Sequence, residues 1–284
     1  MKYKQLLPNK KGFLVVLIGF LLMSTVGVAQ STTVPSHKGK FYFFWGWNRG
    51  SFSNSDIRFN GANYDFTLYD VKAKDRMTPF SFNDYFNLTR ITIPQTNFKL
   101  GYFLNDNYTI SIGVDHMKYV MTNGQSVAID GRINAGTPYD KVYANENILL
   151  DEDFLTFEHT DGLNYVNVEF KRFDDISALI GMHSERFQLN LTEGVGAGFL
   201  FPKTNTTLFG QERYDEFHVS GWGISAAAGI NFTFFKHFFV QTDFKYGYIN
   251  MPNIRTTKNT ADSASQHFTF FEKTLVFGGR FRLF

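Results

Sequence analysis

The chain has 284 residues, no cysteine, and a formal net charge of +2 from 28 basic and 26 acidic residues. The lack of cysteine excludes a disulfide framework and a lipid-anchored N-terminal cysteine, and the near-neutral charge argues against a nucleic-acid-binding surface. Aromatic residues make up 18% of the chain, with 34 phenylalanines, although mean hydropathy is slightly negative. This combination is typical of a transmembrane β-barrel, because alternating strands average out in hydropathy while aromatic girdles add Phe, Tyr and Trp.

The N-terminal residues 1–29 have the pattern of a signal peptide. Four lysines precede an apolar run over residues 13–23, and Gly27, Val28 and Ala29 are small or apolar residues suited to a cleavage site. A membrane-spanning helix needs about 20 apolar residues, which is more than this run provides. We expect export with cleavage after Ala29, which leaves residues 30–284 as one barrel domain.

Residues 40–52 form the first predicted strand, since large apolar side chains at Phe41, Phe43, Trp45 and Trp47 recur with a period of two. Residues 53–93 contain short alternating pieces separated by charges and by turn-forming residues. They predict a long external loop with a hairpin of its own.

Residues 95–104 and 108–121 predict a hairpin around a tight Asn-Asp-Asn turn. Alternation directs Lys99 and Asp115 toward the lumen of a barrel. Residues 122–162, rich in Asn, Gly, Asp and Glu, predict a second long external loop.

Residues 163–173 and 185–201 are the next two predicted strands, and Glu169 and Lys171 share the inward face of the first. Strict alternation in the second would place Glu193 in lipid, where a charge is costly. We therefore expect a β-bulge at Glu193 and Gly194 that turns this carboxylate inward.

Residues 217–234 and 238–251 alternate most regularly, around a turn at Lys236 and His237, with Asp243 and Lys245 on the inward face of the second limb. Each limb exceeds the roughly 9 to 11 residues that cross a bilayer at a tilt. A soluble sandwich would need a second sheet to cover the large apolar face, whereas a membrane barrel turns that face to lipid.

Residues 267–284 complete eight predicted strands. Short turns alternate with long loops, and both ends of the barrel lie on the side of the short turns, as in bacterial outer-membrane barrels. The predicted fold is therefore all-β: an eight-stranded antiparallel transmembrane β-barrel with long extracellular loops, located in the outer membrane.

The predicted signal peptide, the eight amphipathic strands and Phe284 resemble the small eight-stranded bacterial outer-membrane β-barrel proteins over residues 40–284. The stretches FYFFWGWNRGSF and RFRLF are similar to barrels of the Bacteroidetes type. The resemblance implies contact with outer-membrane lipid and lipopolysaccharide, and recognition of the C-terminal strand by the barrel-insertion machinery. One departure is that Phe284 lies on the opposite face from Phe277 and Phe281.

The strongest constellation is a set of charges predicted to face the lumen: Lys99, Asp115, Glu169, Lys171, Asp243, Lys245 and, with the bulge, Glu193. Opposite charges in a narrow lumen can neutralise one another and avoid the cost of unpaired burial. An eight-stranded barrel has an interior that side chains fill, so an ion-paired plug is favoured over a narrow channel or a proton path.

Candidate catalytic groups are weaker. His183, Ser184 and Glu185 include the residue types of a serine hydrolase, but adjacent residues do not easily make triad contacts and this stretch falls at a periplasmic turn. Asp115 and His116 are better placed, near His218, Ser220 or Tyr119, yet alternation separates them onto opposite faces. No histidine spacing suggests a zinc or calcium site, and no cofactor or catalytic residue is assigned.

The sequence thus favours a closed, charge-plugged barrel that serves envelope structure or cell-surface interaction through its external loops, with an unidentified surface ligand. The alternatives are a lipid-A-modifying hydrolase or acyltransferase and, third, a narrow channel.

Overall fold

A computed structural model describes residues 36–90, 93–184 and 186–283. The expected signal peptide and the terminal Phe284 lie outside the described residues. The described chain is an all-β antiparallel sheet of 14 strands. Within this part of the chain, no helix has the length and apolar character needed to span a membrane.

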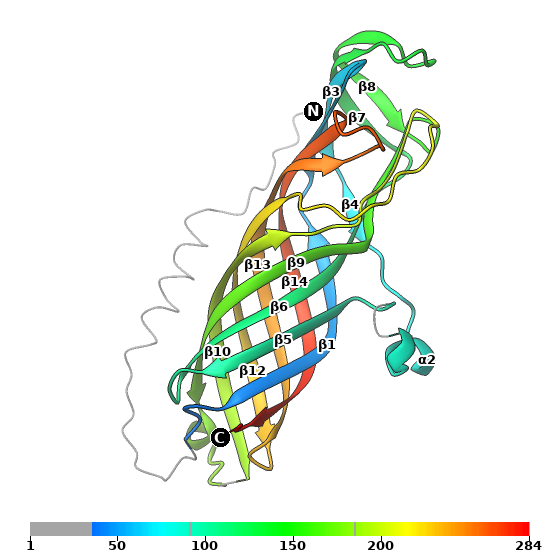
Figure 1. Ribbon diagram of the computed structural model, residues 1–284. Coiled ribbons are helices and arrows are strands. Elements are labelled where there is room, and N and C mark those ends of the chain that lie inside the picture. The colour runs from blue at the N-terminus through cyan, green and yellow to red at the C-terminus, as the bar shows by residue number, and fades with distance from the viewer. Residues whose placement is uncertain (1–35, 91–92, 185, 284) are drawn as a thin grey trace, which may run out of the picture. The chain divides into compact units, whose positions relative to one another are not determined.

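Eight strands carry the sequence patterns described above: β1 (Phe41–Phe52), β5 (Thr96–Phe103), β6 (Tyr108–Met121), β9 (Leu155–Asp175), β10 (Phe187–Leu200), β12 (Gly221–Phe234), β13 (Phe238–Arg255) and β14 (Ser263–Phe281). They pair in this order, and β14 also pairs with β1 over 12 residue positions, from Phe41 opposite Phe281 to Phe52 opposite Phe270. Each strand thus has two antiparallel neighbours, and we call this set the eight-strand ring (Figure 1).

The total of 14 strands corrects the expectation of eight, because the predicted long loops are largely folded as further strands. These are β2 (Ser55–Gly61), β3 (Tyr64–Val71), β4 (Ala73–Asp75), β7 (Gln125–Ile133), β8 (Lys141–Leu150) and β11 (Asn205–Leu208). The hairpin expected within residues 53–93 is present as β2 and β3. The short helices are α2 (Phe82–Tyr85), η1 (Leu88–Arg90) and η2 (Ser177–Ile180).

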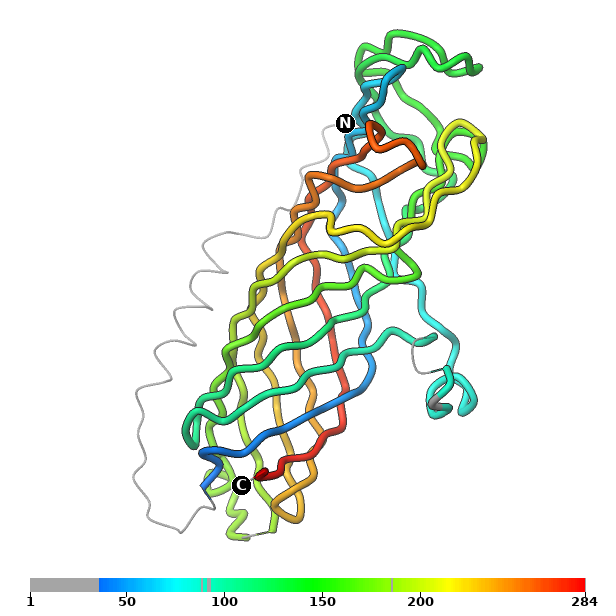
Figure 2. Tube along the Cα trace, viewed as in Figure 1, coloured from blue at the N-terminus to red at the C-terminus, as the bar shows by residue number. Residues whose placement is uncertain are grey.

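The added strands continue the sheet of the ring at one end. From β14 the pairing runs through β2, β3 and β7 to β8, while β4 pairs with β6 and β11 with β9. Figure 2 shows these segments gathered at the end of the ring opposite its short turns. We call the added strands, together with the adjoining ends of β9, β13 and β14, the sheet extension.

The sheet extension has an apolar core of its own. Its fully buried members include Ile57, Phe59 and Leu68, and they pack with Phe154 and Phe157 from the middle of the chain. Phe59 stacks on Phe66 with ring centroids 5.3 Å apart. The predicted long external loops are therefore an ordered β-structure built around side chains that alternate with polar ones.

Along β14 the two faces exchange polarity at one position. Phe268 and Phe270 point inward in the sheet extension, but Glu272, two residues further on the same face, is charged and fully buried. On the outward face His267, Thr269 and the exposed Lys273 are polar, with Phe271 among them, and the exposed Leu275 and Phe277 follow. The inside therefore changes from apolar to polar within a few positions of where the outside changes from polar to apolar.

The same exchange occurs on β9, on the far side of the ring. Tyr165 is the last large aromatic residue of its buried inward face before Asn167 and Glu169, while Val168 on the outward face is exposed. The rings of Tyr165 and Phe270 lie 6.1 Å apart across the interior, so the exchange falls at one level on both strands. We call this level the polarity boundary.

Candidate functional site

Charged side chains fill the middle of the ring interior. Each has no more than 5% of its surface exposed, and each lies on the inward face that alternation assigns to its strand. Its members are Lys99, Asp115, Glu169, Lys171, Asp243, Lys245 and Glu272. We call these seven residues the charge cluster. Six of them are residues that the sequence placed in the lumen.

Three short ion pairs organise the charge cluster. Lys245 Nζ lies 2.5 Å from Asp115 Oδ2, which joins β13 to β6 across the interior. The other two join Lys171 to Asp243 at 2.9 Å and Lys99 to Glu169 at 3.0 Å. Since buried charges are costly unless paired and hydrogen-bonded, this pairing is what allows so many of them inside the ring.

Glu169 is the centre of the charge cluster. Besides Lys99, its carboxylate lies 3.2 Å from Lys171 Nζ and 3.5 Å from Lys245 Nζ. One carboxylate therefore faces three ammonium groups that come from three different strands. The separate pairs are joined into a single network through this residue.

Two buried asparagines connect the charged groups, and the sequence analysis did not include either of them in the network. Asn97 donates hydrogen bonds to Asp115 at 2.7 Å and to Glu272 at 3.1 Å. Asn167 donates to Asp115 at 3.0 Å and accepts from Lys99 at 2.7 Å. Their amides satisfy carboxylate oxygens and an ammonium proton that would otherwise be buried without a partner.

Glu272 is a charged member that sequence reasoning missed. It shares the inward face of β14 with Arg280, so the alternation along this strand contained the signal. Its Oε1 accepts from Asn97, whereas its Oε2 has no hydrogen-bond partner among the described residues and lies 3.8 Å from Lys245 Nζ. With Glu272 the charge cluster has four carboxyl groups against three lysines.

The expected bulge at Glu193 is wrong. The register between β10 and β12 runs without a shift, with Glu193 opposite Ala228, so its side chain lies on the outward face. On its other side Glu193 stands opposite Arg172, which lies on the same outward face. Opposite charges on directly paired residues favour each other, so no bulge is needed to turn the carboxylate inward.

The short-turn end of the ring is closed by aromatic side chains around one arginine. Arg280 is 2% exposed, and its guanidinium lies 5.1 to 5.5 Å from the ring centroids of Phe103, Phe173 and Phe239. It also donates a hydrogen bond to Asn231 Oδ1 at 3.0 Å. Cation–π contact of this kind can stabilise a cation such as this one, which makes no ion pair with a carboxylate among the described residues.

The candidate catalytic residues are not brought together. Asp115 points inward to Lys245, whereas the His116 ring on the outward face is within 2.8 Å of Asn164 Oδ1. Ser220 donates to the backbone carbonyl of His218 at 3.3 Å. Glu185 lies outside the described residues, and Ser184 accepts from the backbone of Arg186. The hydrogen bonds found for these histidines and serines involve no carboxylate.

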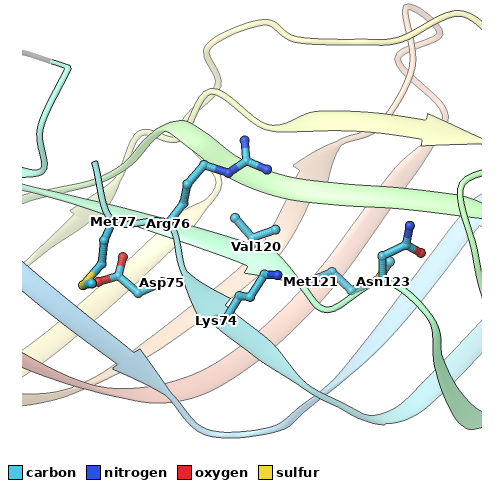
Figure 3. A pocket seen from close by; sticks show the side chains of 7 residues that line it. All are labelled: Lys74, Asp75, Arg76, Met77, Val120, Met121 and Asn123. Atoms are coloured by element: carbon cyan, nitrogen blue, oxygen red, sulfur yellow. The ribbon is translucent and has the colours of Figure 1, made fainter. Parts of the chain in front are cut away.

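A surface pocket of about 430 Å³ lies beside β4 and the end of β6 (Figure 3). Arg76 in its wall makes an ion pair with Glu158 at 2.7 Å, and Asp75 accepts a hydrogen bond from Gln95. Among the described residues, no group of three or more His, Asp or Glu side chains is arranged to hold a metal ion.

No family model matches the chain, and no curated protein sequence matches it either. Among solved structures, Ail, the attachment invasion locus protein of Yersinia pestis, is 10% identical with a TM-score of 0.32, covering 86% of this chain and 99% of its own. The outer membrane protein OprG of Pseudomonas aeruginosa is 10% identical with a TM-score of 0.40, covering 87% and 97%. These likenesses are low, and nothing about function is inferred from them.

Proposed function

We propose that this protein is an outer-membrane β-barrel protein whose eight-strand ring is a closed transmembrane barrel with a plugged lumen. The sheet extension then stands outside the cell and serves envelope structure or cell-surface interaction. The observation that carries this proposal is the polarity boundary, where the inner and outer faces of the same strands exchange character.

A membrane explains the boundary because a surface in lipid is apolar, whereas a large apolar surface is unfavourable in water. On the short-turn side of the boundary the exposed side chains include Ile112, Val168, Ile224 and Phe277, with 42 to 56% of their surface exposed. A band of such residues around a whole ring is far larger than the apolar patches of soluble monomers. A barrel in lipid also leaves no strand edge with unsatisfied backbone groups.

The contents of the ring support a plugged lumen. The charge cluster fills its middle, the aromatic residues around Arg280 fill the short-turn end, and the apolar core of the sheet extension covers the other end. Eight strands enclose only enough space for side chains. The ion pairs of the charge cluster satisfy groups that a conducting pore would leave to water and ions.

The external role rests on the rigidity of the sheet extension, since a packed core presents the same surface to every partner. Outer-membrane lipid and lipopolysaccharide are its proposed surroundings, and the barrel-insertion machinery its proposed assembly partner. The Bacteroidetes type and the signal peptide stay expectations from the sequence, and the surface ligand is unidentified.

The orientation is tested with single cysteines, which report cleanly because the chain has none of its own. On whole cells a membrane-impermeant thiol reagent should label a cysteine at Val142 in β8 and spare one at Asn107 in a short turn. Labelling at Asn107 but not at Val142 would reverse the orientation. Permeabilised cells, in which both positions should react, provide the control.

The plug is tested by conductance. Purified protein in planar bilayers should show no steady single-channel level, because the charge cluster occupies the lumen. A porin added to the same bilayer shows that channels are detectable. A reproducible open level in the wild-type protein would contradict the plug and favour the narrow channel instead.

A further inference from the structure

One segment lies outside both the eight-strand ring and the sheet extension. Residues 77–90 leave β4 and include α2, which stands off the outer surface of the ring (Figure 1). We call residues 77–90 the aromatic arm. Four of its large apolar side chains are mostly exposed: Met77 at 60%, Phe80 at 66%, Phe82 at 76% and Phe86 at 56%.

The aromatic arm is folded, so the exposure of its phenyl rings is part of its structure. Ser81 caps α2 by accepting a hydrogen bond from the Asp84 backbone at 3.0 Å, and Arg90 makes an ion pair with Asp84 at 2.9 Å. Phe82 lies 5.5 Å from Phe80 and 5.7 Å from Phe86 between ring centroids. The three rings form one apolar cluster that nothing in the described chain covers.

Its inner side is attached to β1. The Trp47 ring lies 5.4 Å from Tyr85 and 5.3 Å from Phe86. Tyr85 is buried, donates to the Thr78 carbonyl at 2.7 Å, and accepts from Arg49 at 2.6 Å. These contacts fix the height of the aromatic arm on the ring.

That height is the polarity boundary. On the outward face of β1, Trp47 is the last apolar residue, and Arg49 is the first charged one. Trp47 also contacts Phe277 on β14 at 5.8 Å between ring centroids, so the apolar cluster continues the exposed apolar band of the ring. Lys118, on the neighbouring β6, donates to the Ile93 carbonyl at 2.7 Å beside the returning end of the segment.

We infer that the aromatic arm inserts its phenyl rings among the acyl chains of the outer leaflet, as a lateral membrane anchor beside the barrel. This inference rests on the proposed function, because it takes the ring to lie in lipid. Lipid is the occupant that fits, since the cluster is continuous with the lipid-facing band. Arg49 and Lys118 stand beside it at the level where lipid phosphates begin, and aromatic rings favour this interface.

The test is the depth of a spin label. Single cysteines are placed at Phe82, at Ile112 on the outward face of β6, and at Val142, which is 71% exposed in the sheet extension. The labelled proteins are reconstituted in liposomes, and collision with oxygen is compared with collision with a water-soluble nickel chelate. Labels at Phe82 and Ile112 should favour oxygen at least several-fold over the label at Val142. Heat-modified gel mobility confirms that each variant is folded.

The controls separate the two levels of the proposal. If the label at Phe82 collides preferentially with the nickel chelate while the label at Ile112 collides preferentially with oxygen, the anchor is contradicted and the barrel is not. If the label at Ile112 also collides preferentially with the nickel chelate, the transmembrane barrel itself is contradicted. Dipolar broadening at Phe82 that grows with the protein-to-lipid ratio would show that a second copy covers the cluster, which also overturns lipid insertion.

Discussion

The interior of the eight-strand ring and the interior of the sheet extension are built from opposite kinds of side chain, although the same strands run through both. On β13 the buried inward residues change from Asp243 and Lys245 to Ile249 and Met251 within a few positions. Nothing in the backbone changes with them. On the proposed function, what differs is the surroundings of the outward face, which are lipid around the ring and water around the sheet extension.

The two interiors should therefore fail in different ways. In the ring, removal of one charged side chain leaves its buried partner without a counter-charge, and the whole network is affected. In the sheet extension, removal of a methyl group leaves a cavity whose cost depends on local collapse. Measurements that report on each region separately can test this difference.

The largest effect is expected from Lys245→Met, which leaves Asp115 without its short ion pair and adds to the excess of buried carboxylates. Breaking a buried pair from one side typically costs about 3 to 5 kcal/mol. The temperature at which the folded form loses its gel mobility should fall markedly.

Two companion variants sharpen the result. Lys245→Met combined with Asp115→Asn should recover part of the loss, because both charges of the pair are gone. Glu272→Gln alone should change that temperature little or raise it, since its Oε2 has no hydrogen-bond partner in the described chain. If Lys245→Met melts like the wild type, the charge cluster is solvated and the comparison of interiors is mistaken.

A cavity in the sheet extension should act locally. Leu68 is fully buried there, and Leu→Ala in a core typically costs about 2 to 5 kcal/mol. Leu68→Ala should speed hydrogen exchange in β2 and β3 while the ring strands keep their protection. Leu100→Ala, at an outward position that is 45% exposed, is the matched control and should change neither region. Equal loss of protection in both regions would show that they unfold as one unit.

The smallest expected effect is the pH dependence of the sheet extension. Burial lowers the pKa of His159 to about 4 from its usual value near 6.5, so the folded state binds its proton less readily than the unfolded state. The contribution of His159 is complete above pH 6.5 and is lost as pH falls toward 4, by up to about 3 kcal/mol. Protease resistance of the extension should drop in this window, and His159→Gln should flatten the drop. An unchanged slope in that variant would assign the effect to other groups.

Alternation alone was enough to locate six members of the charge cluster, because a period of two is a local property of a strand. Which lysine meets which carboxylate was not predictable, since Lys245 and Asp115 are 130 positions apart and meet only through the curvature of the ring. The bulge expected at Glu193 was wrong for a related reason: Glu193 stands opposite Arg172 through the pairing of β10 with β9, which alternation along one strand does not reveal.

The alternating pieces of residues 53–93 predicted the hairpin of β2 and β3, but residues 122–162 were taken for a loop because their alternation has the opposite sense. In β7 the exposed Ser126 and Asp130 flank the buried Val127 and Ile129, as in a sheet with water outside. A search for apolar faces turned to lipid passes over such strands. The sequence analysis did not identify the aromatic arm because phenylalanines in a loop do not recur with the period of a strand.

The pairing of β14 with both β1 and β2 has a consequence for assembly. Phe281 stands opposite Phe41, and Ser263 opposite Asn60, so β14 pairs in both the ring and the sheet extension with strands from near the other end of the chain. Pairings between such distant segments form slowly, because a long loop must close before any contact rewards it. Neither region can finish folding until β14 arrives, and a chain that has lost β14 should therefore expose unpaired edges on three strands, β13, β1 and β2.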